Sequence, residues 1–241
     1  MTGVPSANSP DMKIKTLHLV EGARKARGLT VIIDVFRAFS LACYMVDQGA
    51  ERIIPVDDIQ TAYRLKSENP DYMLVGEQNN MKPPGFDFGN SPFQVKNFDF
   101  SGKTVVHTTS AGTKGIVNAV FSDEILTGSF VNAGAVIRYI KKNNPPEVSL
   151  VCMGYSASHP IEEDNYCAQY IQNSLENISS DFGQMVEAIK STSGRRFFMD
   201  VQVHCPSEDF FLCLDLNRFD FILKAEKRSD GLINLLCHDV K

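Results

Sequence analysis

The sequence predicts an α/β protein whose largely parallel or mixed sheet is layered with helices and followed by a smaller C-terminal α+β part. Six short runs rich in apolar and β-branched residues occur within residues 30–153, and segments with helical periodicity separate most of them. Strands that alternate with helices of this length imply βαβ crossovers, and therefore a mainly parallel sheet covered by helices. After about residue 180 the pattern changes to short apolar runs mixed with charges.

Each expected strand is bounded by polar or turn residues. The strands are expected at 30–35, 52–56, 72–76, 103–108, 124–128 and 147–153. The helices between them are expected at 37–48, 59–68, 112–121, 130–143 and 163–177. Residues 77–102 lack helical periodicity and are too many for an ordinary connection, which is typical of a functional loop in a compact domain. Phe86, Phe88 and Phe93 give this loop apolar anchors.

The C-terminal residues predict a further helix within 179–196, and then a strand, a helix and a small hairpin within 197–236. We interpret 1–180 as an α/β core that carries most of the active-site loops, and 181–241 as an α+β segment packed on that core. One continuous domain over 12–241 is the alternative. With 43% hydrophobic residues and 16 Phe, the chain can bury a large core in either case.

Composition narrows the class of protein. A net charge of −5 argues against a non-specific nucleic-acid binder, because such binding needs Lys and Arg clustered on one face. The densest basic pairs, Arg195-Arg196 and Lys227-Arg228, are short and expected to be solvated. The absence of an apolar stretch of ~20 residues and of a signal-peptide h-region predicts a cytoplasmic protein that does not span a membrane. The six cysteines are widely spaced, which indicates buried thiols rather than a zinc site or disulfides.

Polar residues follow several of the expected strands, at the edge of a parallel sheet where ligands usually bind. They are Asp34 and Arg37 after the first strand, Glu77 after the third, the turn HTTSAGTKG at 107–115, and the acidic run Glu162-Glu163-Asp164. Carboxylates, hydroxyls, a guanidinium and glycine turns are together suited to bind an anion and a cation.

Each of these features also has a plain structural explanation. Asp34 could be a hydrogen-bonded structural carboxylate with Arg37 as its partner, and the 108–113 turn could be a capped helix start. Asp87 and Asn90 could be turn formers, and the acidic run could complement a helix dipole. His107 falls inside a strand and is expected to be packed there. His159 is the better acid–base candidate.

In order along the chain, the segments IDVFRAFS, GE, GFDFGNSP, HTTSAGTKGI, LTGSFVNA and EEDNYCA resemble the 2-phosphosulfolactate phosphatase family. The resemblance covers about residues 34–235, with a tail that runs from Gly194-Arg195-Arg196 to Asp230-Gly231. It implies an α/β fold of that family's own kind. It also implies hydrolysis of the phosphate ester of a sulfonated lactate with Mg²⁺, as a step in making coenzyme M.

The resemblance and the chemistry together suggest roles. Mg²⁺ prefers oxygen ligands and usually takes one or two carboxylates. The expected metal ligands are Asp34, Glu77, Glu163 and Asp164. The last two are chosen because they match the Glu-Asp pair of the family, and Glu162 is then expected to face solvent. The expected catalytic residues are Asp34, Arg37, Glu77 and Asp164. The expected substrate-binding residues are Arg37, Asn90, Ser91, Thr108, Thr109, Gly112, Thr113 and Lys114. Direct attack by water is expected, because the sequence has no Asp-x-Asp nucleophile signature.

Three departures from the family pattern leave the natural ester open. Phe39 replaces a hydroxyl residue, Ala111 replaces Asn, and Lys114 replaces Arg, which is not equivalent to Lys at a tight oxyanion site. The expected partner is a small phosphorylated and possibly sulfonated organic acid, and the chain could form a homo-oligomer. A catalytically inactive anion-binding or sensor protein is the alternative. A nucleotide-binding oxidoreductase is disfavoured, because no G-x-G-x-x-G follows the first strand.

Overall fold

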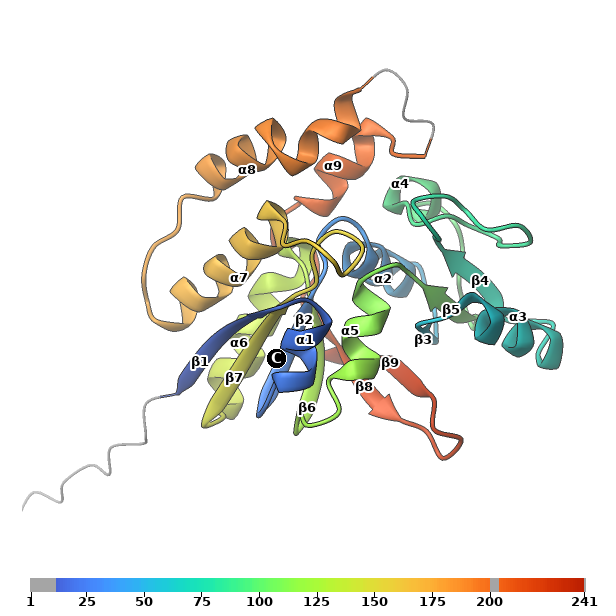
Figure 1. Cartoon of the computed structure of the whole chain (residues 1–241), viewed down its shortest axis with the longest axis horizontal. Coiled ribbons are helices and arrows are strands. Elements are labelled where there is room, and N and C mark those ends of the chain that lie inside the picture. The colour runs from blue at the N-terminus through green and yellow to red at the C-terminus, as the bar shows by residue number, and fades with distance from the viewer. Residues whose placement is uncertain (1–11, 200–203, 241) are drawn as a thin grey trace, which may run out of the picture.

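Nine strands form one mixed sheet in a computed structural model that describes residues 12–199 and 204–240 (Figure 1). The strands are β1 (Lys13–His18), β2 (Leu29–Ile33), β3 (Arg52–Val56), β4 (Met73–Gly76), β5 (Thr104–Thr108), β6 (Glu124–Gly128), β7 (Glu147–Cys152), β8 (Phe221–Lys227) and β9 (Ile233–Asp239). Their order across the sheet is β1-β7-β2-β6-β8-β9-β3-β5-β4. The predicted α/β class with a parallel or mixed sheet is confirmed.

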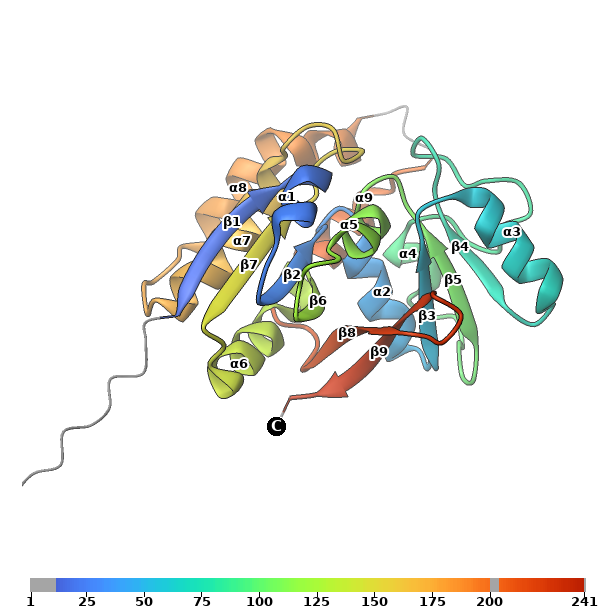
Figure 2. The same cartoon turned by 60° about the horizontal axis from the view of Figure 1, so that its bottom comes forward.

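The sheet consists of two parallel blocks joined by the C-terminal hairpin. β1, β7, β2 and β6 form one block, β3, β5 and β4 form the other, and β8 and β9 lie between them with antiparallel pairing (Figure 2). The two junctions are narrow, since β6 shares two register pairs with β8 and β3 shares a single pair, Ile53 with Leu235, with β9. Three antiparallel steps reverse the strand direction between the blocks. In a flat sheet the carboxyl ends of the two blocks would then lie at opposite edges, so the sheet must twist and bend for residues of both blocks to line one pocket.

The expected helices are present with small changes in their ends, but α4 lies within the 77–102 loop, where no helix was expected. They are α1 (Leu19–Lys25), α2 (Ala38–Asp47), α3 (Ile59–Glu68), α4 (Pro92–Val95), α5 (Gly112–Asn118), α6 (Ala133–Asn143), α7 (Glu162–Leu175), α8 (Phe182–Ser191) and α9 (Ser207–Cys213), with 3₁₀ turns η1 (Phe130–Asn132) and η2 (Ser193–Phe198). The helix expected at 112–121 ends early, at Asn118, and leaves Val120 and Phe121 exposed. Within the described ranges, every helix is too short or too polar to cross a lipid bilayer.

Two expectations for the chain ends need correction. β1 and α1 were missed, although the alternation of polar and apolar residues in Lys-Ile-Lys-Thr-Leu-His is typical of an edge strand that is only partly buried, as β1 is. The strand expected after residue 197 is wrong in its first residues, which belong to η2, and 200–203 lie outside the described residues. The hairpin exists, but it lies inside the sheet. The division at residue 180 stays an interpretation, since both parts share one sheet.

The core lies on both faces of the sheet. Val31 and Ile33 of β2 pack into one cluster with α6 and α7, whereas Ile32 packs into the other with α2. All five residues of β2 are buried, because side chains of a strand alternate between faces and both faces are covered here. Five of the six free cysteines are buried as expected, but Cys237 is exposed.

Candidate active site

Strand ends from both blocks border one small pocket, the inner pocket, of about 30 Å³. Asp34 follows β2, Glu77 follows β4, the 109–111 turn follows β5, and Gly154 to Ser156 follow β7. Its lining comprises Asp34, Phe36, Arg37, Glu77, Asn80, Asn90, Thr109, Ser110, Ala111, Gly154, Tyr155, Ser156, Ile161, Glu163, Asp164, Arg196 and Cys205. The four carboxylates predicted to act together are therefore brought together.

Three of these carboxyls are buried close enough to disturb one another. Burial is the largest cause and raises the pKa of Asp34 to about 6 and the pKa of Glu163 to about 7. Burial and then the charges of Asp34 and Glu163 raise the pKa of Asp164 well above its ordinary value. Crowded, desolvated carboxylates favour a bound proton or cation, and such clusters are typical of functional sites.

Asp164 ties two strands together. Its Oδ1 accepts a hydrogen bond from the backbone N–H of Val35 at 2.9 Å, and its Oδ2 accepts one from Gly154 at 2.8 Å. Val35 follows β2 and Gly154 follows β7, so this carboxylate holds the ends of two parallel strands in place.

Glu163 keeps one oxygen free. Its side chain is 1% exposed, and its Oε1 lies 3.8 Å from Nη2 of Arg196, beyond hydrogen-bond distance. Its Oε2 is buried and has no hydrogen-bond partner among the described residues. A buried oxygen without a partner indicates a missing ligand. The neighbouring Glu162 is exposed, as expected.

Glu77 fixes the two turns on its side of the pocket. Its Oε1 accepts from the backbone N–H of Ser110 at 2.6 Å, and its Oε2 accepts from Ser110 Oγ at 3.0 Å and from the backbone N–H of Asn80 at 2.7 Å. The residue before it must be glycine. Gly76 has φ +141°, and a Cβ there would lie 1.9 Å from the carbonyl oxygen of Thr108.

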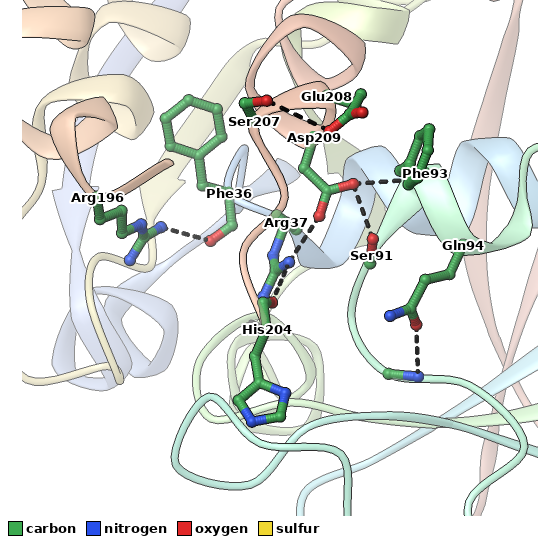
Figure 3. Close-up of polar contacts among 11 residues, drawn as sticks. Phe36, Arg37, Ser91, Phe93, Gln94, Arg196, His204, Ser207, Glu208 and Asp209 are labelled. Atoms are coloured by element: carbon green, nitrogen blue, oxygen red, sulfur yellow. Dashed lines mark hydrogen bonds and ion pairs between the residues drawn. The ribbon is translucent and has the colours of Figure 1, made fainter. Parts of the chain in front are cut away.

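Arg37 pairs with Asp209 of α9, not with Asp34 (Figure 3). Its Nη1 donates to Asp209 Oδ2 at 2.6 Å and to the carbonyl of His204 at 2.9 Å. Asp209 is fully buried and also accepts from Ser91 Oγ at 2.9 Å and from the backbone N–H of Phe93 at 2.8 Å. The C-terminal part thus anchors both Arg37 and the 77–102 loop.

The predicted loop residues divide between two roles. Asn90 lines the inner pocket, and its buried Oδ1 lacks a partner, whereas Ser91 is turned to Asp209. Asp87 has a structural contact, but a different one from the expected turn: its Oδ2 accepts from the backbone N–H of Leu74 in β4 at 2.7 Å. Phe86 is buried as an anchor, but Phe93 is 37% exposed.

The 108–114 turn contributes mainly backbone and Thr109. Thr113 is fully buried, and its Oγ1 donates to the carbonyl of Thr109 at 3.0 Å. Gly112 permits close approach, because a Cβ there would lie 2.9 Å from Asp34 Oδ2. Thr108 and Lys114 border an adjoining cavity of about 390 Å³, together with Asp57, Asp58 and Glu77.

His107 is packed as expected, whereas His159, the acid–base candidate, lies outside the lining of the inner pocket. His107 is fully buried, neither ring nitrogen has a partner, and burial lowers its pKa to about 4, which confirms a packed side chain. His159 is exposed, its Nδ1 contacts Ser158 Oγ at 2.9 Å, and it is not part of the inner pocket's lining.

Sequence reasoning missed several pocket residues, above all Arg196. The expectation that Arg196 is solvated is wrong, since its side chain is 21% exposed and donates to the carbonyl of Phe36 at 3.3 Å. Asn80 and Tyr155 also line the pocket and are joined by a hydrogen bond of 2.7 Å. No local pattern identifies these residues, although Arg196 belongs to the Gly-Arg-Arg segment of the resemblance.

The donor set fits Mg²⁺. All the candidate ligands are carboxylate oxygens, and Glu163 Oε2 lacks a partner. In the part of the chain that the structure describes, no group of three or more His, Cys, Asp or Glu side chains is arranged as a ready metal site. One or two carboxylates with water are the usual protein ligands of Mg²⁺, so Asp34 and Glu163 are a sufficient pair.

Comparison with known proteins identifies relatives of one kind. The sequence profile of the family described as 2-phosphosulpholactate phosphatase matches residues 14–228. A probable 2-phosphosulfolactate phosphatase of Thermotoga petrophila is 39% identical over 133 residues, which cover 55% of this chain and 56% of that protein. The match thus spans little more than half of that relative. One of Bacillus subtilis is 30% identical over 204 residues, covering 83% of this chain and 87% of that protein. One of Thermoplasma volcanium is 29% identical over 208 residues, covering 86% and 94%.

Proposed function

The chain belongs to the 2-phosphosulpholactate phosphatase family, and from this we propose that it is a Mg²⁺-dependent phosphoric monoester hydrolase. The proposed substrate is 2-phosphosulfolactate or a closely related acidic phosphate ester, which is hydrolysed to the hydroxy-acid and phosphate. The observation that carries this proposal is the cluster of buried carboxyls, Asp34, Glu163 and Asp164, which line one pocket together with Arg37 and Arg196.

Hydrolysis of a phosphate monoester in water is very slow, so catalysis must come mainly from charge neutralisation and positioning. Bound Mg²⁺ would supply positive charge to the phosphate oxygens. We assign Asp34 and Glu163 as its holders. Glu77 and Asp164 keep the strand ends in register, because their oxygens accept backbone N–H groups.

The remaining pocket residues are assigned to the phosphate and the water. Arg37, Asn90 and the backbone N–H of Ala111 are proposed to donate to the phosphoryl oxygens, because the N–H groups of Thr109 and Ser110 already donate to Thr113 and Glu77. Asp34 is also proposed to orient the attacking water and to accept its proton.

The departures from the family pattern bear unequally on this assignment. Phe39 is fully buried in the core, and Lys114 borders the adjoining cavity, so neither removes a group from the inner pocket. Ala111 does line the inner pocket. An inactive anion-binding protein on the same scaffold therefore remains the second candidate. A role in coenzyme M-type biosynthesis, a cytoplasmic location and a homo-oligomer are supported by sequence reasoning only.

A phosphate-release assay separates the two candidates. The full chain is incubated with 2-phosphosulfolactate, 2-phospholactate and p-nitrophenyl phosphate, with Mg²⁺ or with EDTA. We expect release from the acidic esters that stops in EDTA and returns with added Mg²⁺. Release that is unaffected by EDTA contradicts the metal assignment. Binding of the esters without any release favours the inactive protein.

A further inference from the structure

A second cavity of about 360 Å³ adjoins the inner pocket, and we name it the side chamber. Its polar lining consists of Asn80, Tyr155, Ser193, Arg196, His204 and Cys205. Four of these residues, Asn80, Tyr155, Arg196 and Cys205, also line the inner pocket, so the two cavities share a wall. The inner pocket has room for about two water molecules. A substrate with a phosphate in that pocket must therefore extend into a neighbouring cavity.

The side chamber is the more cationic of the two neighbouring cavities. Among the described residues, its lining includes Arg196 and His204 and no carboxylate. The cavity around Lys114 is bordered by Asp57, Asp58 and Glu77. An additional acid group on the substrate is repelled by carboxylates, so electrostatics direct it to the side chamber.

The guanidinium of Arg196 has donors to spare. Its one side-chain hydrogen bond among the described residues is from Nη2 to the carbonyl of Phe36, at 3.3 Å. Its Nε is buried without a partner in the part of the chain that the structure describes, and Glu163 is too far away, at 3.8 Å, to accept a hydrogen bond. The ring centroids of Tyr155 and Phe197 lie 5.7 Å and 5.3 Å from the guanidinium carbon. The planar guanidinium of Arg196 is thus held in place by these contacts, and some of its N–H groups donate to no described residue.

Arg37 is less suited than Arg196 to bind an additional acid group of the substrate. Its charge is compensated by the fully buried Asp209, whose Oδ2 lies 2.6 Å from Nη1 of Arg37. The same Nη1 also donates to the carbonyl of His204 (Figure 3). Within residues 12–199 and 204–240, Arg196 has no comparable partner, because its ion pair there is with Glu163 at 3.8 Å. Among the described residues, the guanidinium on the wall of the side chamber is thus the one without a carboxylate at hydrogen-bond distance.

We propose that the side chamber is a second anion subsite, in which Arg196 binds the carboxylate or sulfonate of the substrate while the phosphate lies in the inner pocket. The proposal rests on the proposed function for the identity of the substrate. A planar guanidinium with free N–H groups can donate two parallel hydrogen bonds to such an oxyanion, which an ammonium group cannot do. Arg196 is therefore a positioning and specificity residue.

The test measures binding without turnover. The probe is 3-sulfolactate, which carries both non-reacting acid groups and no phosphate, and its dissociation constant is measured by calorimetry with the full chain. The variants are Arg196→Gln and, as a matched control with the same loss of charge, the adjacent and exposed Arg195→Gln. We expect wild type and Arg195→Gln to bind alike, and Arg196→Gln to bind about 10- to 100-fold more weakly. Lactate and isethionate, each with one of the two acid groups, identify which group Arg196 binds.

Arg196→Lys provides a second variant that keeps the charge, and melting curves verify that each variant is folded. We expect Arg196→Lys to bind more weakly than wild type. Equal affinity of Arg196→Gln and Arg195→Gln, or no binding of 3-sulfolactate by a wild type that releases phosphate from the ester, overturns the subsite. If binding depends on Arg196 but no ester is hydrolysed, the subsite stands and the proposed function fails.

Discussion

The adjacent residues Glu163 and Asp164 have different surroundings at the start of α7. Both oxygens of Asp164 accept backbone N–H groups, whereas one oxygen of Glu163 has no partner. Helix geometry predicted that at most two of the three successive acids can share a cleft, because they point ~100° apart, and the resemblance to the family selected Glu163 and Asp164. The sequence could not predict that Asp164 is the one that accepts backbone hydrogen bonds, since the donors Val35 and Gly154 come from distant segments.

Replacement of Asp164 should affect both stability and activity. In Asp164→Asn the amide NH₂ meets a backbone N–H donor, so one hydrogen bond is lost and a buried donor is left without an acceptor. We expect the free energy of unfolding to fall by about 1–3 kcal/mol and most phosphate release to be lost. Glu162→Gln is the control, and denaturant unfolding with activity assays measures both. Equal behaviour of the two variants would show that Asp164 merely complements the helix dipole.

Other residues of the site were beyond sequence reasoning for the same physical reason. Arg196 contacts the carbonyl of Phe36, and Asp209 pairs with Arg37, across separations of 160 and 172 residues. Composition alone makes a short basic pair look solvated and an Asp in the first turn of a helix look like a dipole partner. Tertiary packing decides otherwise here.

At the scale of elements, the turns after β4 and β5 form one unit. Glu77 accepts from Ser110 and Asn80, and Gly76 lies against the backbone of Thr108. The strands, the long loop and the glycine-containing turn were predictable from periodicity and turn residues. Their mutual contact was not, because it depends on β4 and β5 pairing in parallel, in a register that places Gly76 opposite Thr108.

Gly76→Ala tests this contact. The new Cβ would meet the Thr108 carbonyl at 1.9 Å and would need a positive φ of 141°. We expect a loss of about 3 kcal/mol or more in the free energy of unfolding, from overpacking and backbone strain together. Gly85→Ala is the control, because its φ is +75° but no atom lies within 4 Å of the added Cβ. It should lose only about 1–2 kcal/mol. Similar losses in the two variants would contradict the close approach.

At the scale of the whole molecule, the C-terminal hairpin joins the two parallel blocks. The predicted alternation of strands and helices describes each block, but it does not predict that β8 and β9 insert between them. Short apolar runs mixed with charges are typical of a peripheral hairpin. The pairing of β8 with β6 and of β9 with β3 involves so few residues that no sequence pattern indicates it. The inner pocket, bordered by residues of both blocks, depends on this insertion.

The buried carboxyls make the stability of the metal-free protein depend on pH. The folded-state pKa values of Asp34 and Glu163, about 6 and about 7, lie above their ordinary values, so the folded state binds more protons than the unfolded state from about pH 4 to 7. Stability should therefore fall as the pH rises through this window, by on the order of 3 kcal/mol per group.

Melting curves in EDTA at pH 5 and pH 8 measure this effect. We expect a lower melting temperature at pH 8, a partial recovery with Mg²⁺ at that pH, and a flatter profile for the double variant Asp34→Asn, Glu163→Gln. If wild type and double variant show the same pH profile in EDTA, other groups cause the dependence and the carboxyls do not form the proposed cluster.

The most direct test of the proposed site is the rate of phosphate release from 2-phosphosulfolactate by wild type, Glu163→Gln and Glu162→Gln at saturating Mg²⁺. Glu163 and Glu162 are adjacent acids, one buried with an oxygen that lacks a partner and one exposed. We predict that Glu162→Gln retains the wild-type rate and that Glu163→Gln loses at least about 100-fold, as expected when a group that acts on the transition state is removed. Equal rates for the two variants would contradict the proposed active site.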